Sequence, residues 1–339
     1  MVRVPSRLSF ILILLIAAAT SAGLILALRP LLARYAVAQP NARSSHLAPT
    51  PQGGGIAVVA ATIIAVLAAA VIAIDPAATL GLWPVAIAVL LLAVIGACDD
   101  VVHLSVAPRF AVQFAAVGIV LLTLPHEARV VPLLPWWIER AALLIAGVYA
   151  VNVANFMDGL DWMTVAEVVP VTAGVWILAM LGALPPPDTA VAVALLGAVI
   201  GFAPFNRPVA KLFLGDVGSL PIGLLMFWLL LRLAADGHVI AALLLPMYYL
   251  GDATVTLLRR LARGENVLRA HRTHFYQGAT DRGFSVNGVV ARVFVVNLEL
   301  VGLAAAAVVA PSWWTQLVAL ALGVGAVGLL LAYFARGKR

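Results

Sequence analysis

The sequence predicts an all-α, polytopic integral membrane protein: a bundle of about 11 transmembrane helices with its active site on the cytoplasmic face. Hydrophobic residues make up 64% of the 339 residues, and charged residues make up only 11%. The mean hydropathy is +1.08, and long apolar runs recur from one end of the chain to the other. Apolar runs of about 20 residues cross a bilayer as helices, which satisfy their own backbone hydrogen bonds.

The first apolar run, residues 8–28, follows Arg3 and Arg7 and is longer than the apolar segment of a typical signal peptide. We therefore expect an uncleaved first span. With no recognisable soluble domain, linker or internal repeat, residues 1–339 are expected to form one membrane domain. The expected spans are residues 8–28, 55–74, 82–98, 110–124, 138–151, 164–183, 189–203, 218–233, 239–257, 290–310 and 314–333.

The loops between these spans differ in charge. With 11 spans, 16 of the 21 lysines and arginines fall on one side of the membrane and five on the other. The positive-inside rule makes the richer side cytoplasmic, with the N-terminus outside and the C-terminus inside. A basic inner face suits anionic headgroups and phosphates, and no feature indicates nucleic-acid binding. The single cysteine, Cys98, excludes an internal disulfide.

Most of the polar residues cluster in the predicted inner loops. The central cluster, residues 205–219, lies between two apolar spans and contains Lys211 and Asp216, the latter between Gly215 and Gly218. An ionisable group this close to the hydrocarbon is seldom without a use. A carboxylate in a glycine turn, with a lysine nearby, suits a divalent metal that carries phosphate oxygens. The alternative is a plain connecting loop.

A second cluster places Asp99 and Asp100 side by side at the C-terminal end of a span. Adjacent carboxylates repel each other, and the helix dipole disfavours negative charge at this end. A metal, a cationic partner or a proton-transfer role would explain the pair. A pair of solvated acids at a helix end is the alternative.

A third cluster repeats an amide or an acid at every third position: Asn152, Asn155, Asp158 and Asp161. On a helix, residues three apart share a face, so the two asparagines are expected to point together. Gly159 is expected to break the helix, so that the two aspartates face a site from a turn.

Two further loops offer groups that bind anions. The first inner loop carries Arg43 and His46, and its residues 50–55 end in three glycines that open a helix, where free N–H groups can receive an anion. A plain connecting loop is the alternative. The longest inner loop, residues 258–289, is the most basic, and its arginines and histidines suit a pyrophosphate or a lipid phosphate. A surface loop that binds lipid headgroups is the alternative. Two histidines alone are a weak zinc signal, because no cysteine or second pair supports them. We also expect Asp252 to pair with Arg259 and to orient this loop.

Together the clusters resemble the motif set of the polyprenyl-phosphate N-acetylhexosamine-1-phosphate transferases, a glycosyltransferase family 4-like group. The motifs lie in the family's order between residues 40 and 285. Loops RSSHLAPTPQGGG and HRTHFYQ are most similar to the bacterial O-antigen and surface-polysaccharide initiating branch. A denser histidine cluster, typical of the muramoyl-pentapeptide branch, is missing. The motifs are Asp99-Asp100, NVANFMDGLD (152–161), FNRPVAKLFLGDVGS (205–219) and the His-Arg-rich loop.

The resemblance implies transfer of an N-acetylhexosamine-1-phosphate from a UDP-sugar to undecaprenyl phosphate, with UMP released, in the bacterial inner membrane. It implies Mg²⁺, for which Mn²⁺ can substitute, held by Asn155 and Asp216. Asp99 is similar in position to a base that deprotonates the lipid phosphate, with Asp100 beside it, and a homodimer is expected. The implied substrate-binding residues are Asp158, Asp161 for uracil, Phe213 stacked on the base, and Lys211, Arg269, His271, Arg272 and His274 for phosphates and the amino sugar.

The chemistry is reasonable without the family, since attack by one phosphate on another needs charge neutralised and the nucleophile aligned. The second pKa of a phosphate is about 6, so Asp99 is expected to act mainly in positioning, with direct attack by the lipid phosphate. Two alternatives are a membrane transporter, which would place its charges near the midplane, and a magnesium-dependent membrane prenyltransferase, whose acid-rich paired motifs are missing.

Overall fold

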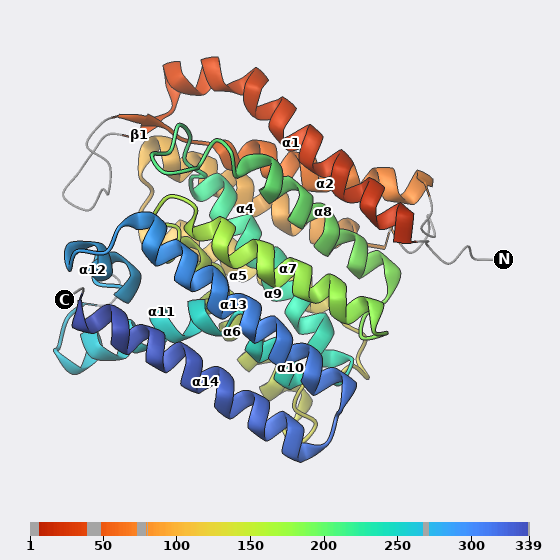
Figure 1. Ribbon diagram of the computed structural model, residues 1–339. Helices are drawn as coiled ribbons and strands as arrows, with labels where there is room; N and C mark the ends of the chain where they lie inside the picture. The colour runs from red at the N-terminus through yellow and green to blue at the C-terminus, as the bar shows by residue number, and fades with distance from the viewer. Residues whose placement is uncertain (1–6, 39–48, 73–78, 80, 267–270, 338–339) are drawn as a thin grey trace.

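The computed structural model describes residues 7–38, 49–72, 79, 81–266 and 271–337 as one bundle of helices with a two-residue antiparallel hairpin at one end (Figure 1). Arg43, His46 and Arg269 lie outside the described residues. The elements are α1 (Arg7–Tyr35), β1 (Val37–Ala38), β2 (Thr50–Pro51), α2 (Gly54–Ile72), α4 (Trp83–Val102), α5 (Val106–Leu122), α6 (Trp136–Phe156), α7 (Met163–Met180), α8 (Pro186–Phe202), α9 (Asp216–Ala235), α10 (Val239–Leu244), α11 (Met247–Ala262), α12 (Phe275–Asp281), α13 (Val286–Val309) and α14 (Trp313–Arg336).

The predicted fold class is confirmed. In the described part of the chain, eight helices are long and apolar enough to cross a membrane, and α5 and α8 are shorter apolar helices. The expected span 239–257 is two helices, α10 and α11, with Pro246 between them. Proline has no N–H to continue the helical ladder, which accounts for the break. The first helical residue, Arg7, and the last, Arg336, lie at opposite ends of the bundle (Figure 1).

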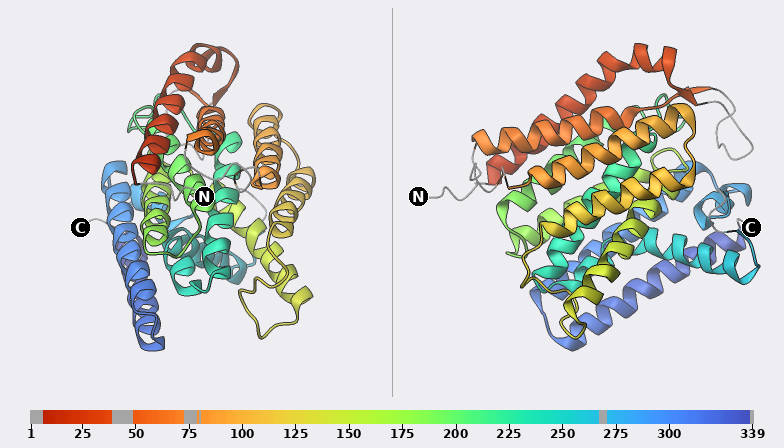
Figure 2. Two further views of the ribbon diagram at one scale, coloured as in Figure 1. Left: turned by 90° about the vertical axis from the view of Figure 1, so that its right-hand side faces the viewer. Right: turned by 180° about the vertical axis from the view of Figure 1, so that it is seen from behind.

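Helix α9 lies at the centre of the bundle, with nearly all of its residues buried. It contacts α2, α4, α6, α7, α8 and α10. On the face seen from behind, α2, α4, α5 and α6 lie side by side (Figure 2). Asp216, the first residue of α9, therefore begins the helix that the others surround, and the ends of its neighbours lie around it.

Helices α2 and α4 approach the start of α9 closely. A Cβ atom on Gly55 of α2 would lie 2.2 Å from the Cα of Gly218, and one on Gly96 of α4 would lie 2.4 Å from the carbonyl oxygen of Asp216. Neither position has space for a side chain. Glycine at both positions lets α2 and α4 approach the backbone that carries Asp216.

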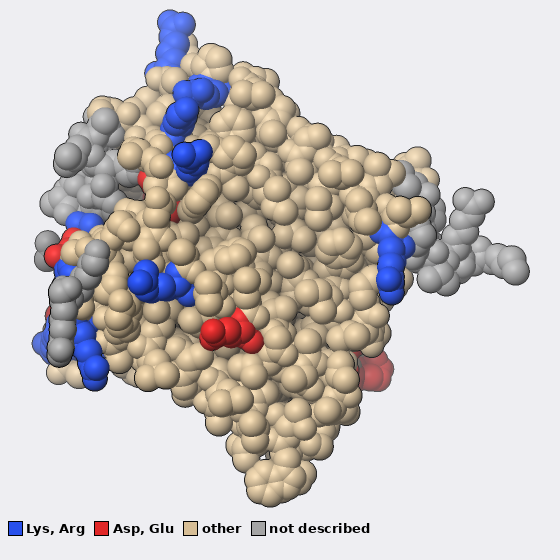
Figure 3. Space-filling view, viewed as in Figure 1, with Lys and Arg blue, Asp and Glu red and all other residues tan. Residues whose placement is uncertain are grey.

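Charge is uneven between the two ends of the bundle. In the view of Figure 3, most lysine and arginine side chains lie towards the end that carries the hairpin and α12, and the flank between the ends is largely uncharged. The start of α9 lies at the same end, since Gln52 next to β2 forms a bridge with Phe213. The polar clusters of the sequence are thus gathered at the basic end.

Candidate active site

The last turns of α4 and α6 meet the first turn of α9. This meeting brings together Asp99 and Asp100 from α4, Asn155 from α6 and Asp216 from α9. As expected, α6 carries Asn152 and Asn155 on the helix and ends at Phe156, ahead of Gly159.

Asn155 and Asp216 are in direct contact. The Asn155 Nδ2 donates to Asp216 Oδ1 at 2.7 Å and to Ser219 Oγ at 2.9 Å. Asn152, one turn earlier, points to a different partner, with its Nδ2 donating to Gln113 Oε1 at 2.7 Å. Asn152 therefore connects α6 to α5, whereas Asn155 connects α6 to α9.

Asp100 caps the start of α9. Its Oδ1 accepts from the Asp216 N–H at 2.9 Å and its Oδ2 from the Val217 N–H at 3.1 Å. Its own backbone carbonyl accepts from Gln52 Nε2 at 2.9 Å. A carboxylate at a helix N-terminus satisfies free N–H groups and is favoured by the dipole. The geometry gives Asp100 a part in holding Asp216 in place.

Asp99 has a cationic partner that the sequence interpretation left without a role. The Arg109 guanidinium, at the start of α5, lies 2.7 Å from Asp99 Oδ2 and 3.5 Å from Asp216 Oδ2. Asp99 Oδ1 also accepts from the Leu104 N–H at 2.6 Å. Two adjacent carboxylates at the C-terminal end of a helix already indicated a nearby cation, and Arg109 is close to them in the sequence.

The donor set suits a magnesium ion that carries phosphate. No group of three or more His, Cys, Asp or Glu residues in the described ranges is arranged to hold a metal ion by itself. Magnesium at phosphate sites is bound through one or two carboxylates together with substrate oxygens, and Asp216 and Asp99 offer carboxylate oxygens. The Asn155 amide presents its NH₂ group to Asp216, and it would bind a metal only after turning its oxygen to that side.

The remaining aspartates of the third cluster lie in the turn between α6 and α7. Asp161 is buried, and its Oδ2 accepts from the Ala210 N–H at 2.9 Å. Asp158 accepts from the Thr164 hydroxyl. Burial raises the pKa of Asp158 to about 7, and nearby carboxylates, Asp216 foremost, act in the same direction. Asp161 therefore ties this turn to the loop before α9.

Lys211 and Phe213 belong to that loop. The Lys211 side chain is exposed, and Phe213 is half-buried. The backbone of Phe213 joins β2, because its N–H donates to the Pro51 carbonyl at 2.8 Å. Neither side chain lines the cavity described below.

The glycine-rich start of α2 is hydrogen-bonded to the loop before α9. The N–H groups of Gly54 and Gly55 donate to the carbonyls of Phe213 and Leu214 at 2.9 Å and 2.8 Å. Both donors are occupied by backbone, so these two N–H groups are not free to receive an anion, in agreement with the alternative of a plain connecting loop. They hold the loop before Asp216 against α2.

The basic loop is anchored by Asp252 of α11. This buried carboxylate accepts from His274 Nδ1 at 3.1 Å and from the N–H groups of Phe275 and Tyr276 at 3.0 Å and 3.1 Å. Asp252 therefore caps α12 and orients the loop, as expected, but its partner is His274. The predicted partner, Arg259, lies over the Phe275 ring, 4.4 Å from its centroid.

A cavity of about 500 Å³ opens beside these groups. Its polar side is formed by Arg109, Asn152, Asn155, Asp216, His271 and His274, and its other side is apolar, with residues of α5 and α6. The two asparagines thus line the same cavity, as expected. The two histidine rings are stacked at 4.9 Å. Of the predicted phosphate-binding residues, His271 and His274 reach this cavity, whereas Arg272 and Lys211 do not.

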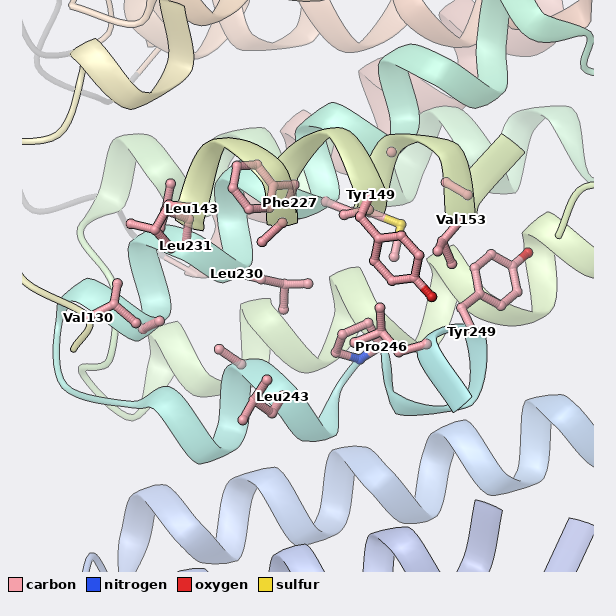
Figure 4. A pocket seen from close by; sticks show the side chains of 18 of the residues that line it. Val130, Leu143, Tyr149, Val153, Phe227, Leu230, Leu231, Leu243, Pro246 and Tyr249 are labelled. Carbon is pink, nitrogen blue, oxygen red and sulfur yellow. The ribbon is translucent and has the colours of Figure 1, made fainter. Parts of the chain in front are cut away.

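A second, almost wholly apolar cavity of about 410 Å³ lies among α6, α9, α10 and α11. Figure 4 shows Tyr149, Phe227, Leu230, Leu243 and Tyr249 around it. Tyr149 lines both cavities. The polar centre thus borders on two apolar spaces.

Comparison with known proteins gives the same group that the motifs indicate. Residues 82–234 match the sequence profile of glycosyl transferase family 4. The chain is 27% identical to the decaprenyl-phosphate N-acetylglucosaminephosphotransferase of Mycolicibacterium smegmatis, over 89% of this chain and 83% of the relative. It is 22% identical to the probable undecaprenyl-phosphate N-acetylglucosaminyl 1-phosphate transferase of Bacillus subtilis, over 77% of this chain and 74% of the relative.

These matches support the predicted family, the glycosyltransferase family 4-like group of polyprenyl-phosphate N-acetylhexosamine-1-phosphate transferases. The family profile spans Asp99, Asn155 and Asp216 and ends before the basic loop. A phospho-N-acetylmuramoyl-pentapeptide-transferase of Wolbachia pipientis wMel matches at 34% identity over only 26% of this chain. The relatives are sugar-phosphate transferases and thus support an enzyme of the transferase class in a bacterial membrane.

Proposed function

We propose that this protein transfers N-acetylhexosamine-1-phosphate from a UDP-sugar to undecaprenyl phosphate. The observation that carries the proposal is the convergence of Asn155, Asp216 and the Asp99–Arg109 pair at the mouth of a cavity with an apolar wall. A polar centre next to an apolar space suits a substrate with a phosphate at the end of a hydrocarbon chain. The cavity around Tyr149 and Phe227 is the space we assign to part of that chain (Figure 4).

In the proposed reaction, a phosphate oxygen of the lipid forms a bond to the β-phosphorus of the UDP-sugar. The bond from that phosphorus to the oxygen bridging to the α-phosphate breaks, and UMP leaves with the electron pair. The product is undecaprenyl-diphospho-N-acetylhexosamine. Because the second pKa of a phosphate is about 6, most of the acceptor is a dianion at neutral pH. The reaction therefore needs alignment and charge neutralisation more than a strong base.

The residues take the following parts in this proposal. Asp216 and Asn155 would hold Mg²⁺, which when bound neutralises phosphate oxygens and orients them. Arg109 supplies fixed positive charge beside them, and Asp99 keeps its guanidinium in place at 2.7 Å. His271, on the same polar side of the cavity, would contact the sugar phosphate.

The wider setting is also a proposal. The basic end of the bundle would face the cytoplasm, which places the N-terminus outside and the C-terminus inside. The initiating step of O-antigen or another surface polysaccharide is the assignment favoured by the His-Arg-Thr-His loop, residues 271–274.

The test uses purified full-length protein with undecaprenyl phosphate, Mg²⁺ and a panel of UDP-N-acetylhexosamines, with UMP release as the readout. We expect UMP only when the lipid phosphate, Mg²⁺ and one preferred sugar are all present, and none from Asp216→Asn. Release of UMP in a burst without the lipid would replace direct attack by a two-step mechanism. No release with any sugar would contradict the proposal.

A further inference from the structure

A third cavity, of about 340 Å³, lies at the basic end of the bundle, among α11, α12 and α14. Arginine is its dominant lining residue. The five guanidinium-bearing residues come from the end of α11, from the segment before α12 and from the residue that follows α12: Arg259, Arg260, Arg263, Arg272 and Arg282.

Positive charge in this cavity exceeds the negative charge beside it. Among the described residues, two carboxylates pair with these arginines: Glu265, 2.8 Å from Arg260 Nε, and Asp281, 3.3 Å from Arg272 Nη2. Glu265 also lies 3.9 Å from Arg263. Five guanidinium groups with two carboxylates leave a surplus of three positive charges. Like charges gathered in one cavity repel unless an anion joins them.

Two of the arginines have their positions fixed by groups other than carboxylates. The Arg259 guanidinium lies over the Phe275 ring at 4.4 Å from the centroid. The Arg282 Nε donates to the Phe334 carbonyl of α14 at 2.8 Å. Their remaining N–H donors are oriented in advance, and less rotamer entropy is lost when a ligand binds.

Gly278 makes room for one of these groups. A Cβ atom at this position would lie 2.7 Å and 2.9 Å from the two terminal nitrogens of Arg282. Any side chain here would push the guanidinium away. The glycine therefore leaves space for the guanidinium of Arg282.

This cavity is separate from the candidate active site, although one segment forms a wall of both. His271 and His274 line the cavity of Asn155 and Asp216, whereas Arg272 and Thr273 line the basic one. Arg272 was expected to hold a substrate phosphate. Its position instead assigns it to a different anion.

We propose that the basic cavity is a second binding site, for a phosphate-bearing anion other than the sugar donor. Arginine forks match phosphate oxygens with pairs of charge-assisted hydrogen bonds. Asp281, which also lines the cavity, is paired with Arg272 and so repels the anion less than a free carboxylate would. The same phosphate chemistry is offered by a soluble phosphate and by the headgroup of an anionic phospholipid.

The test measures the melting temperature of the full-length protein in detergent, since a ligand that binds the folded state raises it. One arm titrates pyrophosphate without divalent metal, at constant ionic strength. The other adds phosphatidylglycerol or, as its control, phosphatidylcholine with the same acyl chains. The variants are the double substitution Arg259→Gln/Arg282→Gln, the single substitution Gly278→Ala, which keeps every charge, and the matched control Arg34→Gln, in the last turn of α1.

We expect a saturable rise for the wild type and for Arg34→Gln in at least one arm. In both cavity variants, the half-saturating concentration should increase at least about tenfold, equivalent to about 1.4 kcal/mol. Response to pyrophosphate identifies a soluble ligand, and response to phosphatidylglycerol alone identifies a headgroup. If neither ligand raises the melting temperature of the wild type, or if the cavity variants respond as the wild type does, the site does not exist. Neither result depends on transferase activity.

Discussion

Asn155 and Asp216 lie 61 residues apart in the sequence, and their side chains are joined by a hydrogen bond of 2.7 Å. The contact links the end of α6 to the start of α9 at the basic end of the bundle. Asp100 holds the first N–H groups of α9 from one side, and the Asp99–Arg109 pair lies on another. Asp216 is therefore held in position by groups from three other helices, α4, α5 and α6.

Replacing Arg109 tests its electrostatic part in the site. Arg109→Gln leaves the carboxylates of Asp99 and Asp216 without their cation, so we expect UMP release to slow by about 10- to 100-fold, as for partners of metal ligands. The matched control is Arg140→Gln, whose arginine donates to two backbone carbonyls in another part of the chain. A wild-type rate for Arg109→Gln would remove this arginine from the mechanism.

Replacing Asp252 tests the anchor of the basic loop. Asp252→Ala leaves the N–H groups of Phe275 and Tyr276 buried without an acceptor, at a cost of about 1–3 kcal/mol each. We expect a clear fall in melting temperature. Thr256→Val removes only one long hydrogen bond to the same carboxylate, of 3.3 Å, and should have a much smaller effect. Equal effects of the two substitutions would show that the loop does not depend on Asp252.

Adding one methyl group at Gly96 tests the close approach of α4 to α9. Its Cβ would lie 2.4 Å from the Asp216 carbonyl oxygen, so Gly96→Ala should destabilise the fold by about 1–3 kcal/mol and displace Asp216. Gly118 in α5 has no atom within 4 Å of the corresponding Cβ position, so Gly118→Ala is the control. Melting temperature and UMP release are measured together, and a neutral Gly96→Ala would contradict the geometry.

His271 gives a prediction for pH. Burial, with the adjacent His274 and Arg260 acting in the same direction, lowers the pKa of His271 from 6.5 to about 4. Between these values the unfolded chain binds a proton that the folded chain does not, so stability falls as the pH drops from 6.5 towards 4. The melting temperature of the wild type should therefore fall more than that of His271→Gln between about pH 7.5 and about pH 5. Equal falls would show that His271 titrates normally.

Much of this arrangement could be predicted because a bilayer imposes strong rules on sequence. Apolar runs mark the helices, and acids such as Asp99 and Asp216 stand out against them. Gly159 was expected to break the helix, and α6 ends shortly before it, at Phe156, in keeping with the low helix propensity of glycine. The break at Pro246 was not predicted, because the residues on both sides of this proline were assigned to one apolar span.

The rest of the site depends on contacts between segments that are far apart in the sequence, which local patterns do not reveal. Asp100 follows Asp99 in the sequence, yet one caps a helix more than a hundred residues away and the other pairs with Arg109. The N–H groups of Gly54 and Gly55 are occupied by the loop before α9, which no local pattern reveals. Arg272 and His271 are neighbours that line different cavities, because the segment that contains them forms a wall of both.

The proposed magnesium site is tested most directly by titrating Mn²⁺ into the metal-free, full-length protein and measuring bound ion by electron paramagnetic resonance. We predict that the wild type binds an ion that Asp216→Asn and Asn155→Ala each bind at least about tenfold more weakly. Asp236→Asn, at the other end of α9, is the control and should bind as the wild type does. Unchanged Mn²⁺ affinity in both Asp216→Asn and Asn155→Ala would contradict the assignment of these two residues as metal ligands.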